Sequence, residues 1–343
     1  MRVLITGGGG FLGSQLAKHL LQRGVLVGPS GTPEPIREIV LFDALFARPL
    51  PTAAAPAAPG AAPIRVTALT GDISDRAAVD AALGHDPATS VFHLASMVSG
   101  ECEERFDDAL RVNLDGGRNV FESARALGAA TGVLPRVVFA GSIAAYGGEA
   151  MEPANSDLTK LTPRTTYGMT KVVCELLLND HTRKGHFDGR TARLPTVIIR
   201  PGRPNAAASS WASGMFREPL AGEPCLLPVH RDQGHPMTGY RTVIASLVAL
   251  HDVPAARLGG DRAYVLPART VTPRLAEAAL HEVAAARGLT LGPIVDAFDA
   301  RIQGIVSNWP VGIDGARAVA LGLPVPPPLP ELIAHYLEDF ASK

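Results

Sequence analysis

The chain has 343 residues, of which 46% are hydrophobic and 19% charged, and its formal net charge is −1. This composition is typical of a globular protein with ample material for a core. The absence of a basic excess or a run of Lys or Arg argues against nucleic acid and anionic membranes as partners. No apolar stretch approaches the ~20 residues of a spanning helix, and the opening MRVLITGGGG leaves no room for a secretory signal.

The three cysteines, Cys102, Cys174 and Cys225, are odd in number and widely spaced. Such usage indicates reduced thiols rather than a disulfide framework or a zinc site. We therefore expect a cytoplasmic protein that holds no metal ion.

Short apolar runs alternate with helical patterns through the first two hundred residues. The apolar runs predict buried strands at 2–6, 38–43, 64–70, 90–95, 135–141 and 191–199. The amphipathic patterns predict helices at 11–23, 75–84, 106–129 and 165–183. This alternation favours an α/β fold with a doubly wound parallel sheet, because strands covered on both faces are apolar without clean alternation.

The alternation breaks down after residue 200. Strands are expected within 223–229 and 263–268 and a helix at 241–252, and Thr272 is a natural N-cap for a last helix. We expect residues 1–200 to form a nucleotide-binding domain and 201–343 mainly a smaller, partly interleaved substrate lobe. The Ala/Pro-rich segment 47–63 is interpreted as a loop insertion.

A glycine-rich stretch follows the first expected strand at once and opens the first helix. In ITGGGGFLG, the residues Gly7, Gly10 and Gly13 are spaced as G-x-x-G-x-x-G around Phe11 and Leu12. Such a turn lets a pyrophosphate approach the bare backbone and the free N–H groups of a helix N-terminus. The position between strand and helix predicts a dinucleotide site of the Rossmann type rather than a simple glycine-rich turn.

Acidic residues end the next two expected strands. Asp43 can accept hydrogen bonds from the adenosine ribose and would repel a 2′-phosphate, so NAD is favoured over NADP. Asp72 can reach the adenine amino group, and Ile73 can pack on the adenine ring.

Tyr167 and Lys171 lie four residues apart in one expected helix, so their side chains share a face. A nearby ammonium lowers the pKa of a phenol, which makes the phenol a better base. Ser142 ends a strand and is expected beside Tyr167. A tyrosine and a lysine at this spacing, taken alone, more often lie on a solvent-exposed helix face. Tyr146 has no lysine four residues on, and His93 lies within a strand, so structural roles are expected for both.

Several motifs in their order resemble the landmarks of the extended short-chain dehydrogenases/reductases. They are TGGGGFLG, GDI (71–73), FHLAS (92–96), VNLDG (112–116), FAGSIAAYG (139–147) and YGMTK (167–171). The resemblance implies a Rossmann-type fold that binds NAD. It also implies that Tyr167 is the acid–base, that Lys171 lowers its pKa, and that Ser142 orients the substrate. Further cofactor contacts implied by these motifs are Leu94, Ala95, Ser96 and Asn113; for Asn113 an internal backbone hydrogen bond is an equal alternative.

Two further stretches, 193–224 and 307–323, resemble a group of these enzymes that oxidises the sugar acid D-erythronate at C2. A carboxylate is best held by arginine, so the substrate candidates include arginines of this region, each of which can instead form a surface ion pair. The expected substrate residues are Ser99, Ser142, Tyr167, Arg200, Asn205 and Arg217.

The resulting hypothesis is NAD-dependent oxidation of D-erythronate, or a close aldonate, to a 2-keto acid. Two alternatives stay open: a nucleotide-sugar epimerase or dehydratase of the same fold, and a non-catalytic NAD-binding sensor. The expected helices 106–129 and 165–183 could form a homodimer face, as in related enzymes.

Overall fold

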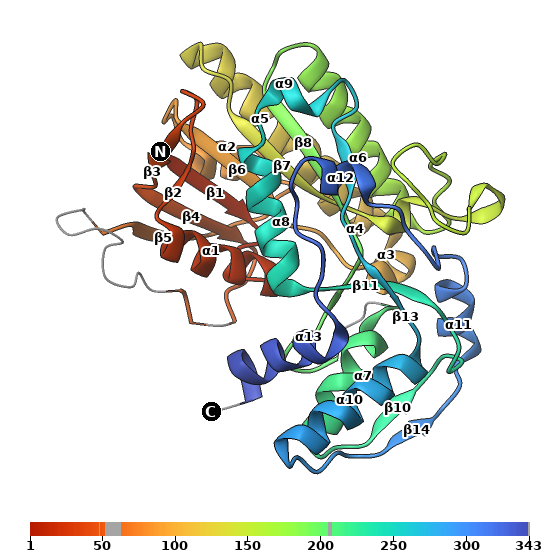
Figure 1. Cartoon of the computed structure of the whole chain (residues 1–343). Coiled ribbons are helices and arrows are strands. Elements are labelled where there is room, and N and C mark those ends of the chain that lie inside the picture. The colour runs from red at the N-terminus through yellow and green to blue at the C-terminus, as the bar shows by residue number, and fades with distance from the viewer. Residues whose placement is uncertain (48, 52–62, 205–207, 342–343) are drawn as a thin grey trace.

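The computed structural model describes residues 1–47, 49–51, 63–204 and 208–341, so most of the expected insertion lies outside the described residues. A parallel sheet of seven strands forms the centre of the larger lobe, in the order β12-β8-β7-β6-β1-β4-β5 (Figure 1). Its strands are β1 (Arg2–Thr6), β4 (Glu38–Asp43), β5 (Arg65–Thr70), β6 (Thr89–His93), β7 (Arg136–Ser142), β8 (Asp188–Leu194) and β12 (Ala263–Val265). The predicted doubly wound parallel sheet is thereby confirmed.

Helices cover both faces of this sheet. One face carries α1 (Phe11–Arg23) and α8 (Tyr240–Asp252), and the other carries α2 (Arg76–Leu83), α5 (Gly116–Thr131) and α6 (Thr166–Arg183). Alternate residues of β1 enter the two layers, because Val3 and Ile5 pack with α1 and α8 whereas Leu4 packs with the other three helices. The strands are apolar throughout because both of their faces are buried.

A smaller lobe packs beside the carboxyl ends of the strands (Figure 1). Its own core includes Trp211, Phe216, Leu280 and Ile333. The elements of this lobe are β9 (Thr196–Ile198), α7 (Ser210–Leu220), β10 (Cys225–Leu227), β11 (His235–Gly239), β13 (Arg269–Val271), α10 (Pro273–Arg287), β14 (Ile294–Asp296), α11 (Ala300–Val306) and α13 (Leu329–Tyr336). Thr272 caps α10 as predicted, because its Oγ1 accepts a hydrogen bond from the N–H of Leu275 at 3.3 Å.

Several boundaries differ from the sequence-based expectation. The strand expected at 191–199 is divided into β8 and β9 at Pro195, which has no N–H to donate to a ladder. The helix expected at 106–129 contains α4 (Phe106–Ala109), a π-helical turn η1 (Leu110–Asp115) and then α5. The remaining short elements are β2 (Val25–Val27), β3 (Pro33–Pro35), α3 (Ser99–Glu104), α9 (Ala255–Leu258), α12 (Ala316–Ala320), η2 (Ile143–Ala145), η3 (Gly148–Ala150) and η4 (Leu337–Ala341). Within the described residues, every helix is too short or too polar to cross a bilayer.

A buried ion pair ties α6 to β8 next to the sheet edge. Arg193 Nε donates to Glu175 Oε2 at 2.9 Å, and both side chains are almost completely buried. Arg193 Nη1 also donates to the hydroxyl of Tyr146 at 2.7 Å, and that hydroxyl donates to the carbonyl oxygen of Ser156 at 2.8 Å. The pair therefore fixes α6, β8 and the segment after β7 relative to one another.

Replacing Glu175 by alanine should lower the free energy of unfolding by about 3–5 kcal/mol, because the guanidinium of Arg193 would stay buried without its counter-ion. Chemical denaturation monitored by circular dichroism measures this loss. Asp180→Ala is the matched control on the same helix, since Asp180 pairs with Arg183 at an exposed position and should matter little. Equal stability of both variants would contradict a structural role for the buried pair.

Candidate active site

A cavity of about 760 Å³ lies along the carboxyl ends of the central strands. In parallel α/β sheets this edge is where ligands bind. Most of the predicted site residues line this cavity: Gly7, Gly10, Phe11, Leu12, Gly13, Asp43, Asp72, Ile73, Leu94, Ala95, Ser96, Ser99, Ser142, Tyr167, Lys171 and Arg200. The structure thus brings together residues from widely separated parts of the chain.

The glycine turn between β1 and α1 leaves no room for side chains. Gly7 has a positive φ of 72°, and a Cβ atom there would lie 2.8 Å from the backbone nitrogen of Ala95. A Cβ on Gly13 would lie 2.2 Å from the carbonyl oxygen of Gly7. Gly10 is the N-cap of α1 and, as a glycine, makes no side-chain hydrogen bond to the first turn of the helix. A bare helix N-terminus in a cavity of this kind fits a pyrophosphate group.

Asp43 closes the turn from the neighbouring strand. Its Oδ2 accepts a hydrogen bond from the N–H of Gly9 at 3.0 Å, and its Oδ1 accepts one from the N–H of Leu45 at 3.4 Å. These contacts hold the carboxylate at the end of β4, in the cavity wall. The position fits a group that binds ribose hydroxyls and repels a 2′-phosphate.

Asp72 has a partner that the sequence did not suggest. Arg111 Nη1 donates to Asp72 Oδ2 and to Ser74 Oγ, each at 2.6 Å. The backbone N–H of Ser74, the Ser74 hydroxyl and the guanidinium of Arg111 hold the pKa of the Asp72 carboxyl below its ordinary value, although partial burial opposes them. Arg111 itself lines the cavity and comes from the π-helical turn η1.

The first turn of α6 places Tyr167 against the end of β7. Thr165 Oγ1 caps the helix by accepting a hydrogen bond from the N–H of Gly168 at 3.0 Å. Gly168 packs so closely on the loop after β7 that a Cβ atom there would lie 2.1 Å from the carbonyl oxygen of Ala144. The hydroxyl of Tyr167 is hydrogen-bonded to Ser142 as a result. Ser142 Oγ also accepts a hydrogen bond from the N–H of Ala144 at 3.1 Å.

Lys171 lies one turn further along α6, with its ammonium directed into the same site. Its Nζ donates to the carbonyl oxygen of Ala140 at 2.9 Å and lies 5.4 Å from the ring centroid of Tyr167. Burial lowers the pKa of Lys171 to about 8, because desolvation disfavours the charged form.

Burial also dominates the titration of Tyr167. Desolvation raises the pKa of Tyr167 to about 12, and the hydrogen bond with Ser142 opposes this rise only in part. This direction is opposite to the lowering by Lys171 that the sequence predicted. The physical reason is that the ammonium is itself desolvated and directed at a backbone carbonyl, so the chain alone does not offset the cost of a buried phenolate.

Asn113 does not line the cavity. Its Oδ1 accepts a hydrogen bond from the N–H of Met97 at 2.7 Å, and its Nδ2 faces the Met97 carbonyl oxygen, the thiol of Cys102 and the hydroxyl of Thr170. The predicted cofactor contact is therefore replaced by support of the loop after β6. The alternative of an internal hydrogen bond to the backbone describes the Asn113 side chain better than a cofactor contact does.

Tyr146 and His93 are buried in structural contacts. Tyr146 belongs to the Arg193 network described above. His93 Nδ1 lies 2.7 Å from Thr6 Oγ1, and burial together with the charge of Lys171 lowers the pKa of His93 to about 3. An enclosed imidazole that stays neutral is not expected to transfer protons in the site.

The predicted substrate residues divide into three groups. Ser99 and Arg200 line the cavity, whereas Asn205 lies outside the described residues. Arg217 does not reach the cavity wall; its Nη1 donates to the carbonyl oxygen of Arg200 at 3.1 Å, and it pairs with Glu218. Arg217 therefore supports the segment that carries Arg200.

Some lining residues escaped the sequence analysis. They include Glu101, Arg105, Asp108, Arg111, Thr196 and Trp309. Arg111 stands two positions before Asn113 and could have been found from the motif around that residue. Trp309 lies far along the chain, where only the tertiary fold shows that it reaches the cavity.

The fold and the cavity together define a dinucleotide-binding enzyme of the Rossmann type. The chain belongs to the NAD dependent epimerase/dehydratase family, whose model matches residues 3–237. NAD is the cofactor of this family, and the glycine turn and Asp43 fit it.

Two curated relatives are similar from end to end. D-erythronate dehydrogenase of Cupriavidus necator is 42% identical over 99% of this chain and 98% of its own length. D-erythronate dehydrogenase of Haemophilus influenzae is 35% identical over 98% of this chain and 99% of its own length. Among solved structures, a nucleoside-diphosphate-sugar epimerase from Agrobacterium tumefaciens has a TM-score of 0.86 and 33% identity, and covers 99% of this chain and 94% of its own.

Asp43→Asn should raise the affinity for NADPH relative to NADH by roughly tenfold, which corresponds to ~1.4 kcal/mol. The amide keeps an acceptor for the N–H of Gly9 and removes the charge that repels a 2′-phosphate. Titration of NADH and NADPH fluorescence gives both dissociation constants. Asp72→Asn is the matched control in the same cavity and should change both constants alike. An unchanged ratio in Asp43→Asn would assign the ribose contact to another group.

Proposed function

We propose that this NAD-dependent dehydrogenase oxidises the C2 hydroxyl of a short sugar acid, most specifically D-erythronate, to 2-dehydro-D-erythronate. The observation that carries the proposal is the convergence of Tyr167, Lys171 and Ser142 on one side of the cavity, in a chain that resembles two D-erythronate dehydrogenases over nearly its whole length.

The chain's own residues hold the cofactor. The glycine turn receives the pyrophosphate, Asp43 binds the adenosine ribose, and Asp72 with Ile73 receives the adenine. Bound NAD⁺ supplies the acceptor for the hydride from C2 and a positively charged ring. Lys171 holds its ammonium beside Tyr167 in the same cavity.

Tyr167 serves as the general base. The substrate hydroxyl gives its proton to the Tyr167 phenolate as the C2–H bond breaks, so that the products are a 2-keto acid, a neutral phenol and the reduced cofactor. Because burial alone holds the pKa of Tyr167 near 12, the phenolate depends on positive charge nearby. The ammonium of Lys171 supplies part of that charge.

Ser142 orients the substrate oxygen. Its Oγ already accepts a hydrogen bond from the N–H of Ala144, so its own proton is available to the oxygen atoms of the site. Ser142 and Tyr167 thus bind the same oxygen from two directions. Arg200 is the proposed partner of the carboxylate, since it lines the cavity and its segment is held by Arg217.

A nucleotide-sugar epimerase is the second candidate, favoured by the similarity to the Agrobacterium tumefaciens epimerase. Such an enzyme must hold a nucleoside diphosphate in addition to the dinucleotide, whereas the two D-erythronate dehydrogenases match this chain at higher identity than the epimerase does. Steady NADH production from NAD⁺ and D-erythronate supports the dehydrogenase. Turnover of a UDP-sugar without NADH release would support the epimerase, and NAD binding without any turnover would support a sensor.

Tyr167→Phe should lower kcat for D-erythronate by at least about 10²-fold, because it removes the hydroxyl that exchanges the proton. NADH binding should stay nearly unchanged. Tyr146→Phe is the matched control, since Tyr146 is buried in the Arg193 network and does not line the cavity. Its activity should be retained with reduced thermal stability. Full turnover by Tyr167→Phe would refute the assigned base.

Lys171→Met should shift the rise of kcat with pH to higher pH. The ammonium favours the phenolate of Tyr167, so its removal raises the pKa of the base and leaves less phenolate at any given pH. The pH profile of kcat between pH 6 and 10 measures the shift. The Lys171→Arg variant keeps the charge and should move the profile less. Identical profiles for Met and native protein would mean that Lys171 does not act through the tyrosine.

A further inference from the structure

We infer that Trp309 limits the length of the acid that the cavity accepts, an inference that rests on the proposed function. Among the described residues after Ser213, Trp309 alone lines the cavity. It joins Thr196, Ser209 and Ser210 in the wall formed by the smaller lobe. Trp309 therefore belongs to the part of the cavity wall that the smaller lobe contributes.

The indole is held by a second ring behind it. The ring centroids of Trp309 and His235 lie 5.6 Å apart, and Trp309 is only 7% exposed. His235 Nε2 is hydrogen-bonded to Thr196 Oγ1, which belongs to the cavity wall itself. Trp309 and Thr196 are thus joined through one buried imidazole. The wall at this end of the cavity is a packed unit rather than a set of independent side chains.

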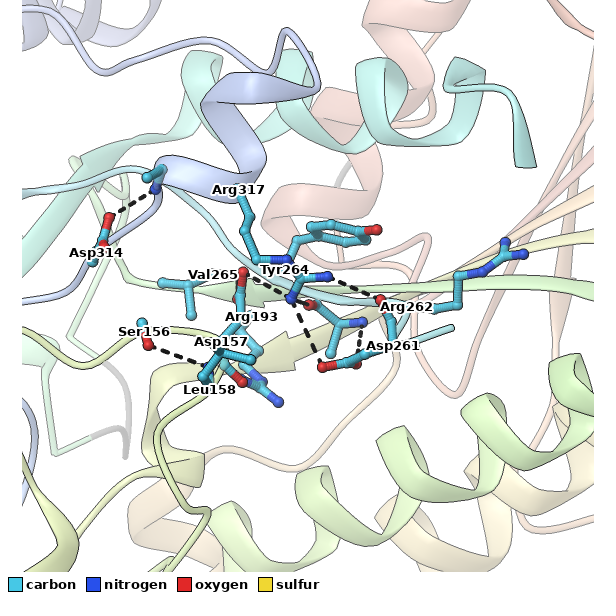
Figure 2. A network of polar contacts seen from close by, with 12 residues as sticks. Ser156, Asp157, Leu158, Arg193, Asp261, Arg262, Tyr264, Val265, Asp314 and Arg317 are labelled. Atoms are coloured by element: carbon cyan, nitrogen blue, oxygen red, sulfur yellow. Dashed lines mark hydrogen bonds and ion pairs between the residues drawn. The ribbon is translucent and has the colours of Figure 1, made fainter. Parts of the chain in front are cut away.

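The segment that carries Trp309 is anchored to the larger lobe (Figure 2). Arg317 Nη1 lies 3.2 Å from Asp157 Oδ2, and Asp157 also accepts a hydrogen bond from the N–H of Val265. The N–H of Asp314 donates to the carbonyl oxygen of Asn155 at 2.8 Å. These contacts tie the chain after Trp309 to the loop after β7 and to β12. A wall anchored in this way has little freedom to retreat from a longer substrate.

Packing alone does not account for an indole at this position. Trp309 Nε1 is buried and has no hydrogen-bond partner among the described residues. A buried donor without an acceptor destabilises a protein, and a phenylalanine would occupy the same region without that cost. The same orphan donor occurs at Trp211, outside the cavity, so the case for Trp309 rests on its place in the cavity wall.

The consequence concerns which acids fit. The same cavity must take the dinucleotide and the acid together, so the acid is confined to the part that the cofactor leaves free. A four-carbon acid held by Tyr167 at C2 ends two carbons further on, whereas five- and six-carbon aldonates continue toward the wall. A rigid aromatic ring in that wall excludes the longer chains by overlap.

The test compares acids of four, five and six carbons with the Trp309→Leu variant. D-Erythronate, D-ribonate and D-gluconate are oxidised with NAD⁺, and kcat/KM is measured for each. Trp309→Leu should lower the preference for the four-carbon acid over the six-carbon acid by at least about tenfold. Trp309→Phe, which keeps a ring, should stay within about threefold of the native preference.

Trp211→Leu is the matched control. Trp211 lies in the same core, also packs near His235 and also has a buried Nε1 without a partner, but it does not line the cavity. The Trp211→Leu variant should keep the native preference for the four-carbon acid. Unchanged NADH affinity shows that the variants are folded; if Trp309→Leu does not fold, Trp309→Met, which also lacks a ring, gives the same comparison.

Calorimetric titration of the three acids into protein saturated with NADH measures binding without turnover. Binding of D-gluconate should appear in Trp309→Leu and be weak in the native protein. A native preference in Trp309→Leu, with normal oxidation of D-erythronate, overturns this inference alone. A native protein that binds NADH but oxidises none of the acids overturns the proposed function and this inference with it.

Discussion

The close packing of α6 on the end of β7 is the constraint on which the site depends. At Gly168 the helix backbone approaches the loop carbonyl so closely that only hydrogen fits between them. Tyr167, immediately before this contact point, is followed at intervals of four residues by Lys171 and Glu175, and the three share the face of α6 that is turned to the sheet. The first meets Ser142, the second meets the carbonyl oxygen of Ala140, and the third pairs with Arg193.

This face combines stability with reactivity at one sheet edge. The pair of Glu175 and Arg193 neutralises two buried charges, whereas the ammonium of Lys171 donates to a backbone carbonyl and pairs with no carboxylate of the described residues. Burial lowers the pKa of Lys171 to about 8 and raises the pKa of Tyr167 to about 12. Both shifts disfavour the charged forms, so they disfavour an ion pair between Lys171 and Tyr167 in the protein without cofactor. A further positive charge beside Tyr167 would favour its phenolate.

Local sequence signals predicted the cofactor half of the molecule well. The strands β1 and β4 match their expected bounds because a buried run of apolar residues ends at a polar turn in each case. The glycine turn, Asp43 and Tyr167 all line the cavity at the carboxyl edge of the sheet. Features set by tertiary contact could not be predicted in this way. The π-helical turn before α5 has no pattern of its own in the sequence, and it decides that Asn113 faces the Met97 loop.

The substrate half depends on contacts between distant segments. This explains why sequence motifs predict the residues of the cofactor turn and of Tyr167 more readily than the residues that select the substrate. The dinucleotide turn is a short stretch whose conformation is set by its own glycines. The far wall, in contrast, requires β9 and β11 to pair so that His235 meets Thr196, and it requires Arg317 to reach Asp157 so that the segment of Trp309 is held. Changes in loops of the smaller lobe can therefore alter the wall without disturbing Tyr167 or the cofactor turn. A fold divided in this way can keep one hydride-transfer centre and exchange the substrates presented to it.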